Sequence, residues 1–102
     1  MKTRDLTGPA LDWAVEVALG GDHTYRPRNY STDWSQGGPI IERERICLDI
    51  GHAGVWLAYS KQNYDDAKQF MYAGPTPLIA AMRCYVASKL GDEVDVPAEL
   101  IA

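Results

Sequence analysis

The sequence contains few of the residues from which metal sites and catalytic centres are usually built. It has only two cysteines and two histidines in 102 residues. Cys47 and Cys84 lie far apart, each among apolar neighbours, a pattern typical of free buried thiols in a reducing compartment. His23 and His52 share no metal-ligand spacing with each other or with the cysteines, so we expect no metal and no cofactor. The sequence also offers no nucleophile–base pair and no evident carboxylate dyad, so we expect no enzymatic activity.

The sequence also lacks an excess of positive charge. The formal net charge is −4, which argues against general nucleic-acid binding because such proteins usually carry a basic stripe. No apolar run approaches the roughly 20 residues needed to cross a bilayer, and the start of the chain leads into no signal-peptide hydrophobic region. We therefore expect a cytoplasmic protein that does not contact a membrane. Arginines could still converge on an anion, and the candidates are Arg26, Arg28, Arg43, Arg45 and Arg83.

Two helices are indicated by their end signals. Thr7 is a possible N-cap for a first helix that Gly20 and Gly21 end. Thr76 is the expected N-cap of a last helix, which begins with Pro77 and ends at Gly91. Its apolar residues repeat at intervals of three and four, and they are Leu78, Ile79, Met82, Tyr85, Val86 and Leu90.

The middle of the chain predicts a small antiparallel sheet. Residues 20–39 show no sustained period and are expected to be irregular. Residues 40–50 are predicted mostly as a strand, with a bulge or turn near the start, because Ile46, Leu48 and Ile50 alternate. Residues 51–54 form a plausible hairpin turn before a returning strand at 55–60, and residues 70–73 are either a short third strand or loop.

The expected architecture is α+β within a single domain that covers residues 1–102. A small antiparallel sheet of two or three strands is packed with an N-terminal and a C-terminal helix. Because the chain is near the size at which a partner assists stability, we also expect a homo-oligomer. In that assembly a second subunit would cover the face of the last helix that is rich in alanine.

The clearest candidate for a binding site is the aromatic, polar and glycine-rich stretch at residues 30–39. In one interpretation Tyr30 or Trp34 stacks on a base, while Ser31, Thr32 and Asp33 hydrogen-bond sugar hydroxyls or base edges. In the other interpretation Trp34 fills the core beside Trp13 and Asp33 caps a turn.

Other candidates could hold a phosphate, and each has a simpler explanation. Gly37 and Gly38 permit close approach of backbone amides to a phosphate, or merely form a turn with Pro39. On a strand Arg43 and Arg45 would share one face and could grip a phosphate, or they could form solvated salt bridges.

The last helix contributes two further candidates. Its N-terminus at Thr76 is a potential anion site, although capping alone explains this residue. Arg83 would either reach into the pocket or pair with an acid in the core or an interface.

Two blocks of the chain, residues 30–43 and 76–86, resemble the phage NinX-like family. This resemblance covers most of the chain and implies a phage or prophage protein of the accessory kind, made in the cytoplasm of a bacterial host. The family's function is unknown, and small phage domains that sequester nucleotide second messengers supply an analogy. We therefore predict a non-enzymatic protein that binds a small nucleotide-like or phosphate-bearing molecule, such as a host antiphage immune signal. The alternative is a module that binds a host or phage polypeptide through the aromatic stretch.

Overall fold

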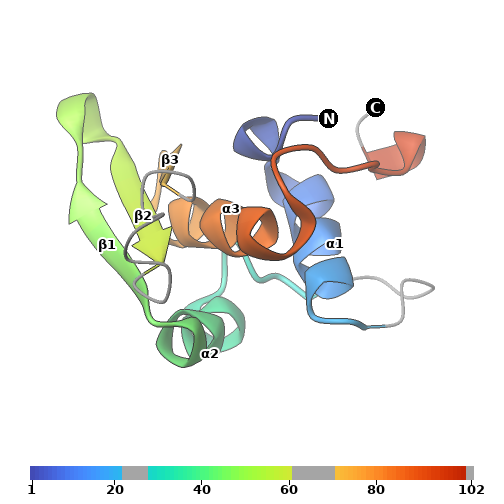
Figure 1. Cartoon of the computed structure of the whole chain (residues 1–102), viewed down its shortest axis with the longest axis horizontal. Helices are drawn as coiled ribbons and strands as arrows, with labels where there is room; N and C mark the ends of the chain where they lie inside the picture. The colour runs from blue at the N-terminus through green and yellow to red at the C-terminus, as the bar shows by residue number, and fades with distance from the viewer. Residues whose placement is uncertain (22–27, 61–70, 101–102) are drawn as a thin grey trace.

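A computed structural model describes residues 1–21, 28–60 and 71–100 of the chain (Figure 1). The helices and strands are η1 (Thr3–Asp5), α1 (Gly8–Ala18), α2 (Trp34–Glu44), β1 (Ile46–Ile50), η2 (His52–Gly54), β2 (Trp56–Ser60), β3 (Tyr72–Gly74), α3 (Pro77–Leu90) and η4 (Ala98–Leu100). The predicted α+β class is confirmed, as are the first helix, the last helix and an antiparallel sheet. His23, Arg26 and most of the polar stretch after β2 lie outside the described residues.

Helix α3 crosses the middle of the molecule, between the sheet and α1, with α2 packed alongside (Figure 1). Thr76 caps it as predicted, since its Oγ1 accepts a hydrogen bond of 3.1 Å from the N–H of Ile79. The helix is buried on nearly all sides, which is expected of a helix without a polar face. Its buried residues are Leu78, Ala80, Ala81, Met82, Cys84, Tyr85, Val86 and Ala87. The expectation that a second subunit covers the alanine face is therefore wrong, because the chain's own elements cover it.

The three strands follow one another in the order β1-β2-β3, and both pairs are antiparallel. The predicted hairpin is confirmed at residues 51–54, where the N–H of Gly51 donates a 2.7 Å hydrogen bond to the Val55 carbonyl. For residues 72 and 73 the alternative left open is decided in favour of a strand, β3, whereas residue 70 lies outside the described residues. Residues Ile46, Leu48 and Ala58 lie on the sheet face that packs against the core.

Helix α2 replaces part of the predicted loop and part of the predicted strand. The prediction of irregular structure is wrong for residues 34–39, and the prediction of strand is wrong for residues 40–44. Asp33 begins the helix, because its Oδ1 accepts hydrogen bonds from the N–H and the hydroxyl of Ser35. Gly37 and Ile40 are buried one turn apart, so the helix is held by packing against α3.

Arg45 joins this helix directly to β1. It has a left-handed backbone conformation, with φ of 55°, which ends α2 and redirects the chain into the strand. Arg43 therefore lies on a helix and Arg45 on its cap, so the prediction that they share one face of a strand is wrong. The turn predicted for Gly37 and Gly38 is also wrong, because both residues lie inside α2.

The start of the chain pairs with the segment that follows α3. The N–H of Thr3 donates to the carbonyl of Asp92, and the N–H of Val94 donates to the carbonyl of Met1, at 2.9 and 2.8 Å. An isolated antiparallel bridge joins Lys2 and Glu93. This pairing holds the first residues against α3 and β3, where they frame the surface described below.

Candidate functional site

Two residues of the aromatic stretch are packed inside the protein. Tyr30 is only 6% exposed, and its hydroxyl donates to Glu16 Oε2 at 3.4 Å. Burial, followed by the charge of Glu16, raises the pKa of Tyr30. Ser31 is 1% exposed, and its N–H donates a 2.8 Å hydrogen bond to Asp12 Oδ1, whereas its buried hydroxyl has no hydrogen-bond partner among the described residues. Tyr30 and Ser31 therefore fasten this part of the chain to α1, and their side chains are shielded from solvent.

Trp34, unlike Tyr30 and Ser31, is exposed to solvent. Its exposed fraction is 52%, so the interpretation that it fills the core is wrong, and Trp13 packs against the core without it. Thr32 is exposed, and the exposed side chain of Asp33 is engaged as the N-cap of α2. The sequence correctly assigned a capping role to Asp33, although it caps a helix and not a turn.

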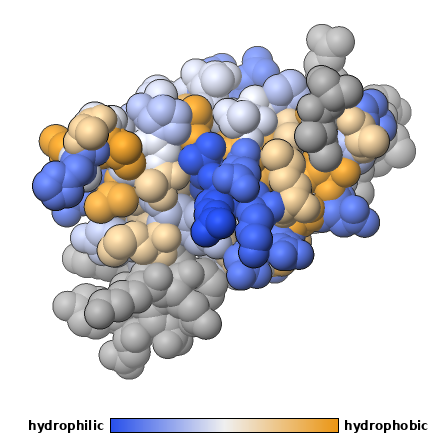
Figure 2. All heavy atoms as spheres, turned by 90° about the horizontal axis from the view of Figure 1, so that it is seen from above, coloured by the Kyte–Doolittle hydropathy of each residue, from blue (hydrophilic) through white to orange (hydrophobic). Residues whose placement is uncertain are grey.

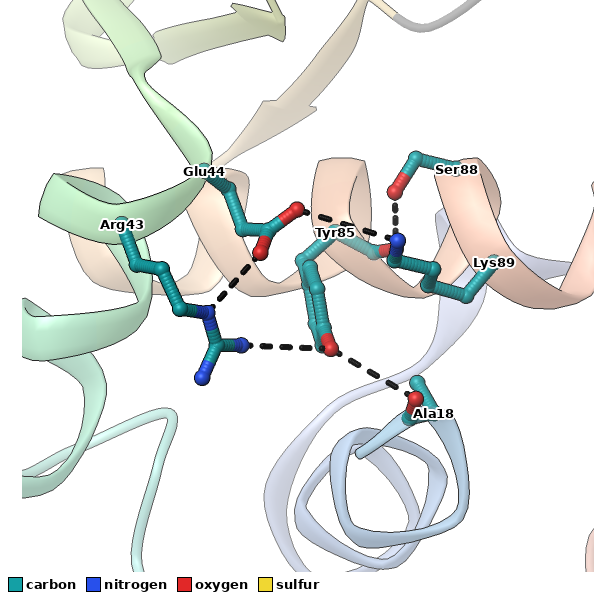
Figure 3. A network of polar contacts seen from close by, with 6 residues as sticks. All are labelled: Ala18, Arg43, Glu44, Tyr85, Ser88 and Lys89. Atoms are coloured by element: carbon teal, nitrogen blue, oxygen red, sulfur yellow. Dashed lines mark hydrogen bonds and ion pairs between the residues drawn. The ribbon is translucent and has the colours of Figure 1, made fainter. Parts of the chain in front are cut away.

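Arg43 belongs to a network that joins three helices (Figure 3). Its Nε donates to Glu44 Oε2 at 2.9 Å, and its Nη2 donates to the Tyr85 hydroxyl at 3.5 Å. The same hydroxyl is 3.5 Å from the Ala18 carbonyl oxygen, and Glu44 lies 3.9 Å from Lys89 Nζ. The hydrogen bond to Glu44 is the main reason that the pKa of Arg43 is raised. This arrangement explains Arg43 as a structural residue.

Arg83 occupies a different environment, between the start of the chain and the edge of the sheet. Its Nε donates to the Leu6 carbonyl at 2.7 Å, and its Nη1 donates to the Ala73 carbonyl at 2.9 Å. Desolvation lowers the pKa of the guanidinium, and the charge of Asp5 opposes this effect. A guanidinium held by two carbonyls is fixed in orientation, which is favourable for recognition of an anion.

Arg83 lines one of two adjoining hollows in the surface. The first, of about 410 Å³, is bounded by Arg83, Arg4, Asp5 and the segment from Ala73 to Pro75. The second, of about 370 Å³, is bounded by Lys2, Arg4, Met71, Tyr72, Ala73 and Asp92. Arg4 and Ala73 line both, so the two hollows adjoin, and we call the pair the Arg4 hollow.

The charges around the Arg4 hollow are mixed. Lys2 and Arg4 line one part with Asp92, and Arg4 and Arg83 line the other with Asp5. Lys2 is also paired with the carboxylate of Glu93 at 3.5 Å, so Arg4 and Arg83 are the cations that remain for a ligand. Figure 2 shows strongly hydrophilic side chains gathered across the middle of the face on which η1 and the hairpin tip lie, with apolar side chains beside them. Burial and the charge of Asp92 raise the pKa of Tyr72, so its phenol stays protonated at neutral pH and can donate a hydrogen bond.

The predicted site residues are thus only partly brought together. Arg83 lies at the Arg4 hollow, whereas neither part of the hollow is lined by Trp34, Arg43, Arg45 or Thr76. Sequence reasoning missed Lys2, Arg4 and Tyr72. The available signal was the alternation of Lys2 and Arg4 about Thr3, which is fully buried and places both cations on the outside.

The family described as Bacteriophage P22, NinX matches residues 21–89. The chain belongs to this family. The match confirms the resemblance carried by residues 30–43 and 76–86, and it identifies a phage protein. It includes Arg83 and Trp34 but not Lys2 or Arg4. No curated protein matches the chain.

None of the helices within residues 1–21, 28–60 and 71–100 combines the length and the apolar character that crossing a membrane requires. In the same residues, no group of three or more His, Cys, Asp or Glu side chains is placed to hold a metal ion. Cys84 is buried as expected, while Cys47 is only partly buried, and the two do not form a disulfide.

Proposed function

We propose that this phage protein binds a small phosphate-bearing molecule, nucleotide-like in character, in the Arg4 hollow without converting it. The observation that carries the proposal is the fixed guanidinium of Arg83 in the same hollow as the exposed side chain of Arg4. These two arginines come from opposite ends of a chain whose net charge is −4. Two guanidinium groups on one surface favour an anionic ligand.

The two carboxylates make a nucleotide a better fit than a bare phosphate. Asp5 and Asp92 would weaken the attraction for a simple anion, since like charges repel at this range. They can instead accept hydrogen bonds from ribose hydroxyls or from the amino group of a base. Phosphate groups would then lie against Arg83 and Arg4, and the ring of Tyr72 offers an apolar contact. Sequestration of a host immune nucleotide is the biological form of this proposal.

Arg4 is the best residue with which to test the site. It is exposed, and no hydrogen bond or ion pair of its side chain is found among the described residues, so Arg4→Gln should leave the fold intact. Arg45→Gln is the matched control, because it removes the same charge from an exposed position outside the Arg4 hollow. Melting temperatures of the three proteins would be measured with nucleoside mono- and diphosphates, cyclic dinucleotides and pyrophosphate.

The expected result is a rise in melting temperature for the unmodified protein and for Arg45→Gln, and a much smaller rise for Arg4→Gln. A ligand at 100 times its Kd stabilises a protein by about 2.7 kcal/mol, which this method detects easily. Equal responses in both variants would place the ligand elsewhere. Recovery of the ligand intact after heating the complex is expected, whereas recovery of a product would contradict binding without conversion.

A second candidate function follows from Trp34. This indole is half exposed on the first turn of α2, and tryptophan is among the residues that most often anchor protein interfaces. A polypeptide partner would bury it. Trp34→Ala would then abolish binding of that polypeptide while leaving both the fold and the nucleotide response unchanged. Loss of the nucleotide response in Trp34→Ala would instead connect the indole with the ligand.

A further inference from the structure

The two edge strands of the sheet, β3 and β1, differ in length and in their contacts with the rest of the chain. At the β3 edge the outward carbonyl of Ala73 accepts a hydrogen bond from Arg83. β3 is also short, with three residues, whereas β1 has five. An edge strand presents unpaired N–H and C=O groups, and these groups are a template for pairing with another strand. Among residues 1–21, 28–60 and 71–100, β1 is therefore the edge at which such pairing is open.

The hairpin shows which groups of β1 face outward. The N–H of Gly51 points toward β2, because it donates to the Val55 carbonyl. Outward and inward groups alternate along a strand, so Asp49 and Cys47 also direct their backbone groups to β2. Ile46, Leu48 and Ile50 then direct theirs to the free edge. The N–H of Ile50 agrees with this assignment, since it donates to the side chain of its neighbour Asp49 at 2.8 Å.

The free edge is also apolar. Ile50 is 71% exposed, the largest exposure among the large hydrophobic side chains of the described residues. It lies on the same strand face as Leu48 and Ile46. Among the described residues, the N–H and C=O of Leu48 have no hydrogen bond outside the sheet ladder. Ile46 and Leu48 pack against the core on that face, so Ile50 is the exposed end of the row and the side chain that a strand pairing at this edge would cover.

We propose that β1 pairs in antiparallel orientation with β1 of a second copy of this chain, about a two-fold axis at Leu48, to join the two sheets into one. In this register Leu48 lies opposite Leu48 of the second copy, and Ile50 lies opposite its Ile46. The apolar row is thus its own complement, and Ile50 loses its exposure. Cys47 lies opposite Asp49 of the second copy.

The neighbouring registers are less favourable. A two-fold axis at Asp49 would place two carboxylates directly opposite each other, which destabilises a sheet. An axis at Cys47 would place Ile50 opposite Glu44, which belongs to α2 and cannot pair as a strand. Only the axis at Leu48 uses all five residues of β1 without opposing like charges. The pairing does not involve the Arg4 hollow, so it stands or falls independently of the proposed ligand.

The register can be tested by a disulfide. Leu48 forms the hydrogen-bonded pair with its own copy, so Cys47 and position 49 form the adjacent non-hydrogen-bonded pair, with Cα atoms about 4.5 Å apart. That separation lies within the range of about 4.4–6.8 Å found for disulfides. Asp49→Cys should therefore oxidise to a covalent dimer through the native Cys47. Asp49 is exposed, and among the described residues its carboxylate accepts only a local hydrogen bond from the N–H of the next residue, so the substitution should leave the fold intact and free the Ile50 N–H for the pairing.

The controls use cysteines already in the chain. Cys47→Ser combined with Asp49→Cys should give no covalent dimer, and the unmodified protein should give none, because its two Cys47 residues are diagonal in this register. Cys84 does not compete, since it is buried and burial raises its pKa to about 12. Linkage in the unmodified protein, or in the double variant, would overturn the proposed register.

Analytical ultracentrifugation and hydrogen exchange of the unmodified protein test the pairing without any substitution. The expected result is a monomer–dimer equilibrium in which the Leu48 amide becomes protected as concentration rises, while amides of η2 do not change. A monomer over the whole concentration range, with rapid exchange at Leu48 throughout, would overturn the proposal.

Discussion

Nη1 of Arg83 lies 2.9 Å from the carbonyl oxygen of Ala73 and donates a hydrogen bond to it at the outer edge of β3. The same guanidinium donates through Nε to Leu6, at the junction of η1 and α1. One side chain of the central helix therefore ties together the start of the chain and the sheet. It also forms a wall of the Arg4 hollow, so the fold and the proposed site depend on the same residue.

Replacing Arg83 should destabilise the protein. Hydrogen bonds to a charged group contribute about 1.5–3 kcal/mol each, so Arg83→Met should cost about 2–4 kcal/mol after allowance for partial solvent exposure. Arg83→Lys should cost roughly half of that, because an ammonium can reach only one of the two carbonyls. Urea unfolding measures both values. Equal losses of unfolding free energy in the two variants would show that bonding both carbonyls at once contributes nothing to stability.

The two helix caps should differ in strength. The Thr76 hydroxyl accepts the N–H of Ile79, whereas Thr7 makes no side-chain capping bond at the start of α1. We expect Thr76→Ala to lower the free energy of unfolding by about 1 kcal/mol and Thr7→Ala to lower it by less. Chemical denaturation of the two variants measures the difference. A larger loss for Thr7→Ala would contradict the observed geometry.

The two adjacent glycines of α2 should respond in opposite directions. A Cβ on Gly37 would lie 2.7 Å from Leu78 Cδ1 and would also meet the Tyr30 carbonyl oxygen. Gly37→Ala should therefore destabilise the protein by about 1–3 kcal/mol through overpacking. On Gly38 the nearest atom is 3.8 Å away, so Gly38→Ala should stabilise by about 0.5–1 kcal/mol through helix propensity. Thermal or urea unfolding would reveal this contrast, and stabilisation by both substitutions would refute the close approach of α2 to α3.

These glycines also explain why the sequence predicted the outer elements better than α2. Helix ends marked by Thr76 and Gly91, and a strand marked by alternation after Arg45, depend on local signals that a single sequence contains. α2 includes two glycines and Pro39, which oppose a helix locally, and it forms because Gly37 and Ile40 pack against α3. Its remaining signals were the Asp33 cap and the spacing of Gly37, Ile40, Ile41 and Glu44.

The candidate site was less predictable than the fold for a related reason. Arg83 was recognised as a candidate because a charged residue interrupts an apolar helix. Its neighbour Arg4 lies nearly 80 positions away in the sequence, and it is brought close by the pairing of the first residues with the segment after α3. Such long-range pairing leaves no periodic signal in a single sequence. Tyr30 and Trp34 illustrate the opposite difficulty, because they are close in the sequence and belong to one aromatic stretch. The sequence did not predict that Tyr30 is buried and Trp34 is exposed.

Asp12 should make stability depend on pH. Burial raises its pKa above the ordinary 3.8, while Ser31, whose N–H donates to the carboxylate, acts in the opposite direction with smaller effect. The neutral carboxyl is therefore favoured in the folded state. Its stabilising contribution is fully present below pH 3.8 and is lost as the pH rises through the raised pKa.

Asp12→Asn isolates this effect, because its amide oxygen can still accept the N–H of Ser31. We expect the stability of Asp12→Asn relative to the unmodified protein to increase from pH 3 upward and then level off. Urea unfolding at several pH values measures the difference. A difference that is constant or decreases with pH would contradict a raised pKa.

The most direct test of the proposed function is a titration followed by nuclear magnetic resonance of the Arg83 Nε–H. The probes are pyrophosphate, adenosine diphosphate and cyclic dinucleotides, with Arg45 Nε–H as the internal reference. We predict that at least one probe shifts the Arg83 resonance together with the amides of Arg4 and Tyr72, and leaves Arg45 unchanged. Shifts confined to α2 around Trp34, or no shift at Arg83 with any probe at millimolar concentration, would contradict a phosphate-binding Arg4 hollow.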